Sequence, residues 1–147
     1  MRILIQRVRK ASVIIEDNVH AQIEQGLLIF VGIHYQDTVE HAKWLANKCI
    51  ALRLFDDSQG KMNLSIEEIK GEILIVSQFT LYGNCMAGRR PEFTQAAKGN
   101  SAHILYQAFV HEVTKLYPKV KTGIFAAAMQ IDLINDGPVT FMIVKSS

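Results

Sequence analysis

Two short polar stretches interrupt apolar runs in this chain, and their residue types could do chemistry. Residues 77–80 (Ser-Gln-Phe-Thr) follow the run 73–76 (Ile-Leu-Ile-Val), which predicts a buried strand. Polar groups at the end of a buried strand are costly unless they are used. Residues 135–140 (Asn-Asp-Gly-Pro-Val-Thr) predict a turn, because Gly137 reaches φ values closed to other residues and Pro138 fixes its own φ. We interpret the two stretches as the reacting site.

The hydroxyl groups of the first stretch leave its chemistry open. If residues 73–82 form one regular strand, Ser77 shares a face with Phe79, and Gln78 shares the other face with Thr80. One face then does not present both hydroxyls. Hydroxyl groups near strand ends also often do no more than bond to the main chain, which is the structural alternative to a reacting role.

Other reactive side chains carry weaker signals. Cys85 is the only thiol in a predicted loop and could act as a nucleophile, but it would need a histidine base and none is nearby in sequence. Asp56 and Asp57 lack a third ligand at metal-binding spacing, which favours a solvated turn. His103 and His111 lack the i,i+4 spacing that would present two ligands on one helix face. We therefore expect no metal and no cofactor.

The bulk properties limit the class of protein. The chain has 147 residues, of which 49% are hydrophobic and 20% charged, so we expect one domain over residues 1–147. A net charge of +2 allows contact with nucleic acid only through a local patch, for which Arg89, Arg90 and Lys98 are candidates. Cys49 and Cys85 form no disulfide framework, and no apolar stretch is long enough to span a bilayer. We expect a cytoplasmic protein with no membrane partner.

The elements that must position the two stretches follow from apolar periodicity. Helices are expected from a cap at Asp37, with Glu40 completing a capping box, and from Ser101 to a stop at Pro118. Cys49 falls in the buried stripe of the first helix. Strands are expected at residues 2–8, 11–16, 19–24, 27–33, 73–82, 129–134 and 139–144. The pattern predicts an α/β fold of the α+β type, a layered β-β-α sandwich of mostly antiparallel or mixed sheets with two main helices.

Residues 77–82 (Ser-Gln-Phe-Thr-Leu-Tyr) and 135–141 (Asn-Asp-Gly-Pro-Val-Thr-Phe) resemble the two signature motifs of the D-aminoacyl-tRNA deacylases, also called D-tyrosyl-tRNA deacylases. The resemblance covers essentially the whole chain. Further matches occur in order at residues 5–8, 11–13, 26–28, 60–64, 88–91 and 129–130. The chain differs from the common pattern at Ala128, where the family often has an acidic residue, and at residues 84–87, which are usually more polar.

The resemblance implies an activity and two partners. Members of the family are cytosolic homodimers that hydrolyse the ester between a D-amino acid and the terminal adenosine of tRNA, and they also act on the achiral glycyl ester. The expected partners are therefore the aminoacylated 3′ end of tRNA and a second copy of the chain, with the site at the subunit interface. Gly137 and Pro138 would form the family's Gly–cisPro element, inserted into the pocket of the partner subunit.

The resemblance also assigns roles to the site residues. Carbonyl oxygens aimed by the Gly–cisPro element would hold the α-ammonium group, so that an L side chain strikes the main chain while a D side chain points to open space. The N–H groups around Phe79 and Thr80 would stabilise the oxyanion. The Thr80 hydroxyl would position water, with a role as nucleophile as the alternative. Assigned to substrate binding are Ser77, Gln78, Gly137 and Pro138, with Met129 and Phe125 packing the adenine and Arg7 bracing the Gly–Pro turn.

Two other functions stay open on the sequence. One is a non-catalytic module that binds the 3′ end of tRNA, and the other is a thiol hydrolase that uses Cys85 on another acyl ester.

Overall fold

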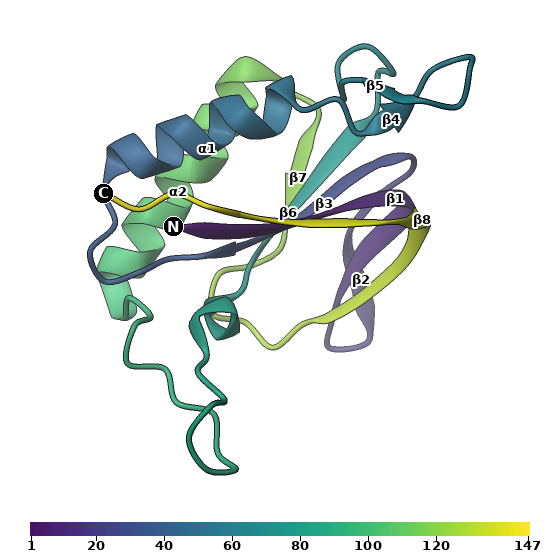
Figure 1. The fold of residues 1–147 in the computed structure, drawn as a ribbon. Helices are drawn as coiled ribbons and strands as arrows, with labels where there is room; N and C mark the ends of the chain where they lie inside the picture. Colours follow the sequence, from purple (N-terminus) through teal and green to yellow (C-terminus); the bar gives the residue numbers. More distant parts are fainter.

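The computed structural model describes all residues, 1–147, and places two helices against one side of a strongly curved sheet (Figure 1). The elements in chain order are β1 (Arg2–Ile15), β2 (Asn18–Ile23), β3 (Gly26–Gly32), α1 (Val39–Ala51), β4 (Phe55–Asp56), β5 (Met62–Leu64), β6 (Glu72–Ser77), the 3-10 helix η1 (Phe79–Tyr82), α2 (Gly99–Leu116), β7 (Val120–Thr122) and β8 (Gln130–Val144). The expected mixed α/β class with two main helices is confirmed.

The main sheet has six strands and is mixed, with the order β2-β1-β3-β6-β7 and β8 paired to β1. Strand β1 is antiparallel to its three neighbours, whereas β3, β6 and β7 run parallel to one another. Strands expected at residues 2–8 and 11–16 are one continuous strand, β1, whose first half pairs with β3 and whose second half pairs with β2. The turn expected between β1 and β2 is present at Glu16 and Asp17, both with positive φ.

The sheet curls until it is nearly closed, so that its shape is closer to a barrel than to two flat layers (Figure 1). Side chains link strands that are not neighbours in the sheet. The Lys121 ammonium on β7 donates to the main-chain oxygen of Gln22 on β2 at 2.6 Å. Near the end of β2, the Glu24 N–H donates to the Glu72 carboxylate on β6 at 3.1 Å. Strands β4 and β5 form a separate two-stranded sheet.

Alternation along β3 and β6 divides the core between the two faces of the sheet. Leu27 and Ile29 of β3 pack with Ile73 of β6 in a cluster beneath the helices. Leu28 and Leu74 point to the opposite face and join a second cluster inside the curl of the sheet. Because both faces are covered, these strands are apolar throughout, as the continuous runs predicted.

Helix α1 begins one residue later than the predicted cap. Its N-cap is Thr38, whose N–H donates to Nδ1 of His41 at 3.3 Å. Asp37 instead accepts hydrogen bonds from the amino group of Met1 and from the N–H of His34, the latter at 2.7 Å. The prediction of Asp37 as the cap with Glu40 was therefore wrong, since long-range partners occupy the carboxylate. None of the helices is both long and apolar enough to cross a membrane.

Strand β8 is one strand with an interruption, not two strands joined by a turn. Asn135 pairs with Val8, and Thr140 pairs with Gln6, so both halves of β8 lie along β1. The four residues 136–139 have no partner in this register and bulge from the strand. The chain therefore does not reverse at Gly137 and Pro138, and the expected turn is corrected to a bulge.

Candidate active site

A cavity of about 810 Å³ opens at the carboxyl ends of the parallel strands β3 and β6. Ligands in α/β sheets commonly bind at such strand ends, where side chains from several loops converge. Of the predicted site residues, the cavity is lined by Ser77, Gln78, Phe79, Phe125 and Met129. The structure thus brings together five of the nine side chains selected from the sequence.

The first predicted stretch changes its main-chain conformation at Gln78. Strand β6 ends at Ser77 and η1 begins at Phe79, so the expected strand over residues 73–82 and its alternation of faces were wrong. The Gln78 N–H donates to the main-chain oxygen of Val31 on β3 at 2.7 Å, which still ties this position to the sheet. The 3-10 helix then turns Phe79 and Thr80 outward, and both are exposed.

Residues of β1 and β3 contact the 3-10 helix and fix its position. Gly32 at the end of β3 leaves room for it, because a Cβ there would lie 3.0 Å from Cβ of Leu81 and 3.2 Å from the Gln78 oxygen. Arg2 donates to the main-chain oxygen of Leu81 at 2.7 Å and lies over the Tyr82 ring at 4.5 Å. These contacts orient the helix toward the cavity.

The polar groups of η1 leave two donors free. The Gln78 amide donates to the Thr80 hydroxyl, which fixes the oxygen lone pairs of that side chain. The N–H groups of Phe79 and Thr80 have no acceptor in the structure, as expected for the first turn of a helix. Phe79 lines the cavity, and two adjacent free N–H groups beginning at this residue can donate hydrogen bonds to an oxygen that develops negative charge.

The opposite wall comes from the segment between β7 and β8. The Phe125 ring lines the cavity, and its neighbour His103 on α2 stacks on it with ring centres 4.6 Å apart. Met129 packs closely against Gly123, where a Cβ would lie 2.7 Å from the sulfur. The small residues in this segment therefore serve close packing, and the ring and thioether give a flat, apolar wall.

Sequence reasoning missed part of the lining. Phe93 meets Phe79 edge to face at 5.1 Å and lines the cavity with Thr94. Lys98, considered only for phosphate contact, also lines it, and Ala102 contributes from the first turns of α2. The one available signal was an aromatic residue, Phe93, in an irregular loop two positions after Pro91.

The side chains that line the cavity provide neither a general base nor an ionisable nucleophile. Lys98 is the only ionisable residue among them, so the lining provides no carboxylate, histidine or thiol to act as base or nucleophile. Cys85 is exposed on the loop after η1 and does not line the cavity. Burial raises the pKa of the Cys49 thiol to about 12, which keeps it protonated and inert. No group of three or more His, Cys, Asp and Glu side chains is arranged to hold a metal ion.

The Gly137–Pro138 peptide bond on the bulge of β8 is cis, as the resemblance implied. Gly137 has φ +144°, a value that a side chain disfavours, and both residues are exposed. Arg7 is 8% exposed, and its Nε donates to the main-chain oxygen of Asp136 at 2.8 Å. Its Nη1 donates to the oxygen of Leu54 at 2.9 Å. Arg7 therefore braces the bulge against the β4–β5 segment.

Asn135 closes the base of the same bulge. Its side-chain oxygen accepts from the N–H of Val139 at 2.7 Å, and its amide donates to the Thr140 hydroxyl at 2.8 Å and to the Val139 oxygen at 3.2 Å. The side chain thus replaces the strand pairing that residues 136–139 lack. The sequence motif contained Asn135, but its spacing gave no indication of this role.

The structure does not bring the bulge and the cavity of one chain together. Gly137, Pro138, Arg7 and Thr80 are absent from the cavity lining, and the first two face outward. Within a single chain, the predicted site is therefore in two parts, the cavity with η1 and the exposed bulge.

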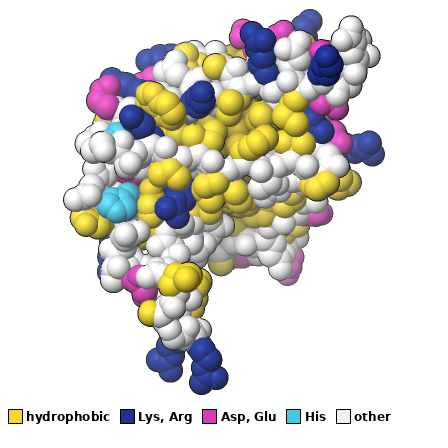
Figure 2. Space-filling view, in the orientation of Figure 1, with side chains coloured by type: hydrophobic (Ala, Val, Ile, Leu, Met, Phe, Trp, Pro, Cys, Tyr) yellow, Lys and Arg dark blue, Asp and Glu magenta, His cyan; other side chains and the backbone are white.

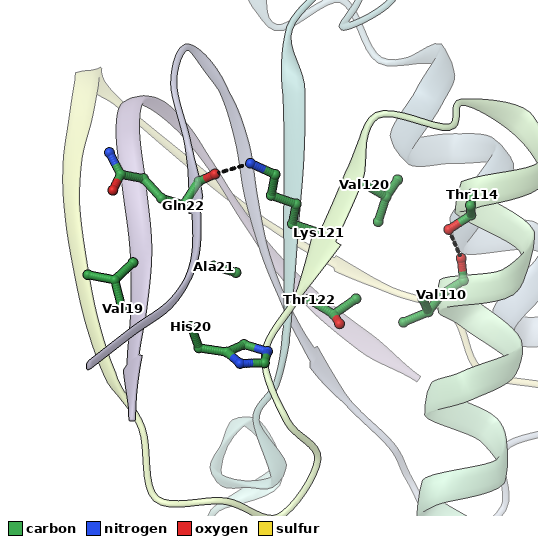
Figure 3. A pocket seen from close by; sticks show the side chains of 9 residues that line it. All are labelled: Val19, His20, Ala21, Gln22, Val110, Thr114, Val120, Lys121 and Thr122. Carbon is green, nitrogen blue, oxygen red and sulfur yellow. Dashed lines mark hydrogen bonds between the residues drawn. The ribbon is translucent and has the colours of Figure 1, made fainter. Parts of the chain in front are cut away.

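A second hollow, of about 470 Å³, lies between β2, β7 and α2 (Figure 3). His20 and Thr122 line it, and the Lys121 side chain crosses it to reach the Gln22 oxygen. It contains none of the predicted site residues. Its only ionisable side chains are one histidine and a lysine already bonded to the main chain, so it offers little chemistry.

Comparison with known proteins identifies relatives along the whole chain. The D-Tyr-tRNA(Tyr) deacylase family profile matches residues 4–144. A D-aminoacyl-tRNA deacylase from Protochlamydia amoebophila is 52% identical over 143 residues, 97% of this chain and 95% of that protein. One from an Exiguobacterium species is 50% identical over 147 residues, all of both chains.

Two solved structures share the fold of the chain. A structure described as c-Myc DNA Unwinding Element Binding Protein superposes with a TM-score of 0.93 at 34% identity, covering all of both chains. A probable eukaryotic D-amino acid tRNA deacylase has a TM-score of 0.84 over 97% of each chain, and at 18% identity it supports the fold alone. From the match to the profile and the identity to full-length relatives, the chain belongs to the D-Tyr-tRNA(Tyr) deacylase family.

Proposed function

We propose that this chain hydrolyses the ester of D-aminoacyl-tRNA to free D-amino acid and tRNA, with each site formed by two copies of the chain. The observation that carries the proposal is the apolar cavity lined by Phe79, whose N–H group is free together with that of the adjacent Thr80, in a chain of this family. A cavity of about 810 Å³ has the size of a small-molecule site and accommodates an aminoacyl group with its terminal nucleoside.

Hydrolysis requires water to attack the ester carbonyl while its oxygen gains negative charge. The N–H groups of Phe79 and Thr80 donate hydrogen bonds to that oxygen, and the Thr80 hydroxyl, which accepts a hydrogen bond from the Gln78 amide, positions the water. The cavity lining supplies no base. The vicinal hydroxyl of the terminal ribose therefore takes part in the proton transfer, and no protein nucleophile is needed. Phe125 and Met129 pack against the adenine, and Ser77 completes the pocket near the ester.

Handedness is read by the bulge of a second copy. Gly137 and Pro138 face outward, lack a partner in the strand register and do not line the cavity of their own chain, so they are available to another chain. In the assembled site their main chain holds the α-ammonium group and leaves no room for an L side chain. Glycyl-tRNA, which has no side chain to exclude, is a further substrate of the same site.

An exposed apolar surface beside the bulge supports the assembly. Strand β8 has β1 as its only neighbour, and it exposes Ile134, Phe141, Met142 and Val144, each by more than 40%. Hydrophobic side chains gather over the middle of the face that β8 crosses (Figure 2). Contiguous apolar surface on a small domain is typical of a protein interface.

The test is deacylation of matched esters by the purified protein. We expect rapid loss of D-tyrosyl-tRNA and slow or no loss of L-tyrosyl-tRNA, with glycyl-tRNA also hydrolysed. If the protein hydrolyses neither ester but still binds tRNA, it is a non-catalytic tRNA-binding module and not a hydrolase. Equal rates of hydrolysis for the D and L esters would refute the role of the bulge in chiral discrimination.

A further inference from the structure

Residues 83–97, here called the arm, leave the body of the protein between η1 and α2 (Figure 1). The arm is ordered by a pair of main-chain hydrogen bonds. The Asn84 N–H donates to the Glu92 oxygen at 2.8 Å, and the Glu92 N–H donates to the Asn84 oxygen at 3.0 Å. Beyond this pair, Gly88 has φ +71° with no atom near the position of a Cβ, as in an open turn at the tip.

The tip of the arm carries uncompensated positive charge. Arg89 and Arg90 are its only basic residues, both are exposed, and neither forms an ion pair. Figure 2 shows Lys or Arg side chains at the far end of the arm. The one acidic residue of the arm, Glu92, accepts hydrogen bonds from the N–H and hydroxyl of Thr94 and forms no ion pair with the arginines.

The base of the arm belongs to the cavity. Phe93 lines the cavity and packs on Phe79 of η1, and the Ala97 N–H donates to the Ile33 oxygen at 2.9 Å. Lys98, which follows directly, lines the cavity as well. The direction of the arm is therefore set by the same contacts that form the wall of the cavity.

We propose that Arg89 and Arg90 bind backbone phosphates of the tRNA whose aminoacylated end occupies the cavity. This rests on the proposed function. The cavity holds only the terminal nucleoside and its amino acid, so the rest of the RNA must leave past the rim that Phe93 and Lys98 help to form. Guanidinium groups match phosphate oxygens bidentately, and two exposed arginines without acidic partners keep that capacity free.

The length of the arm sets where on the RNA the contact falls. Gly88 lies four positions along the chain from Asn84 and from Glu92, which gives a reach of at most about 14 Å for extended chain. With roughly 3.4 Å of duplex axis per phosphate of one strand, that reach corresponds to about four nucleotides. The tip therefore contacts the RNA no more than about four nucleotides from the base of the arm. The contact is to the backbone and independent of base sequence.

The experiment compares Arg89→Gln/Arg90→Gln with a control that removes the same charge elsewhere. Lys48→Gln/Lys61→Gln serves as control, since both lysines are exposed, on α1 and on the loop between β4 and β5, far from the arm in Figure 1. Two substrates are used, D-tyrosyl-tRNA and the 3′-D-tyrosyl ester of adenosine. The readouts are kcat/KM against KCl concentration and the retention of uncharged tRNA on a filter.

For the arm variant we expect the slope of log kcat/KM against log salt on D-tyrosyl-tRNA to become shallower by about two. Retention of uncharged tRNA should weaken with the same change in slope. Activity on the adenosine ester should stay at the wild-type value, because that substrate has no phosphate to contact. The control variant should keep the wild-type slope with both substrates.

Two results would overturn the proposal. One is an arm variant with wild-type slope and wild-type tRNA retention, and the other is a variant that loses activity equally on the adenosine ester, which would make the arm structural. A wild-type protein that hydrolyses neither D ester would refute the proposed function. In that case the tRNA retention assay still decides whether the arm binds RNA.

Discussion

Replacing Arg7 by methionine tests how the bulge at Gly137 and Pro138 is held. Methionine keeps much of the aliphatic volume of a side chain that is 8% exposed, but it leaves the main-chain oxygens of Asp136 and Leu54 without their donor. A hydrogen bond from a charged donor contributes about 1.5–3 kcal/mol. Because Asp136 is only half-buried and can recruit water, we expect the free energy of unfolding to fall by about 2–4 kcal/mol.

The effect on selectivity should exceed the effect on turnover. A displacement of about 1 Å at a positioned group can cost on the order of a hundredfold in rate, and a bulge without its brace no longer excludes an L side chain reliably. We expect the ratio of kcat/KM for D-tyrosyl-tRNA over L-tyrosyl-tRNA to fall by at least about tenfold, measured where urea unfolding shows the variant folded. Arg7→Lys keeps the charge but not the planar guanidinium group. Its ratio of kcat/KM for the two esters should lie between those of the wild type and Arg7→Met.

The matched control is Arg9→Met, two residues along the same strand. Arg9 forms no hydrogen bond or ion pair to the bulge and does not line the cavity. Arg9 is exposed, so its loss should change stability by no more than about 0.5 kcal/mol and leave selectivity intact. If folded Arg7→Met retained the wild-type ratio for the two esters, the argument that Arg7 orients the bulge for chiral discrimination would be refuted.

Three further outcomes follow from the geometry. Gly137→Ala places a Cβ 2.7 Å from Val139 Cγ2 at φ +144°, and should lower stability by about 1–3 kcal/mol in thermal melts and abolish D-ester hydrolysis. Cys85→Ala should leave kcat/KM unchanged, and a thiol reagent should modify Cys85 in the folded protein but reach Cys49 only after unfolding; a large loss of activity would restore the thiol hydrolase. Burial raises the pKa of Tyr106 to about 12, so above pH 10 the unfolded chain releases a proton that the folded chain keeps, and stability should fall from pH 10 to 12. Tyr106→Phe should make that decline shallower in urea titrations, and an unchanged decline would contradict the assignment.

Much of the architecture could be predicted because it depends on local pattern. The continuous apolar run at residues 27–33 correctly predicted a central strand, and the helical stripe correctly placed Cys49 in the core. Ser77 and Gln78 were found because polar groups at the end of a buried strand are costly, and both line the cavity together with their neighbour Phe79.

The errors arose where distant residues decide the local structure. Asp37 was expected to cap a helix, but the amino group of Met1 and the N–H of His34 occupy its carboxylate. The break between β6 and η1 gave no periodic signal, because a single residue in an irregular conformation, Gln78, is enough to make it.

The local sequence did not predict the bulge on β8 either. It depends on Arg7, which lies 129 positions from Asp136 in sequence, and on the pairing of both halves of β8 with one strand. Local sequence around Gly137 and Pro138 indicates only that the main chain departs from a regular strand.

Subunit mixing tests most directly the claim that one chain supplies the cavity and another the bulge. Ala127→Trp fills the cavity with an indole ring, and Gly137→Ala alters the bulge, so each variant alone should be inactive. After unfolding and refolding together in equal amounts, half of the dimers contain one copy of each, and each of these has one intact site. We predict about a quarter of the wild-type rate on D-tyrosyl-tRNA. A mixture as inactive as its two components would contradict a site shared between two copies.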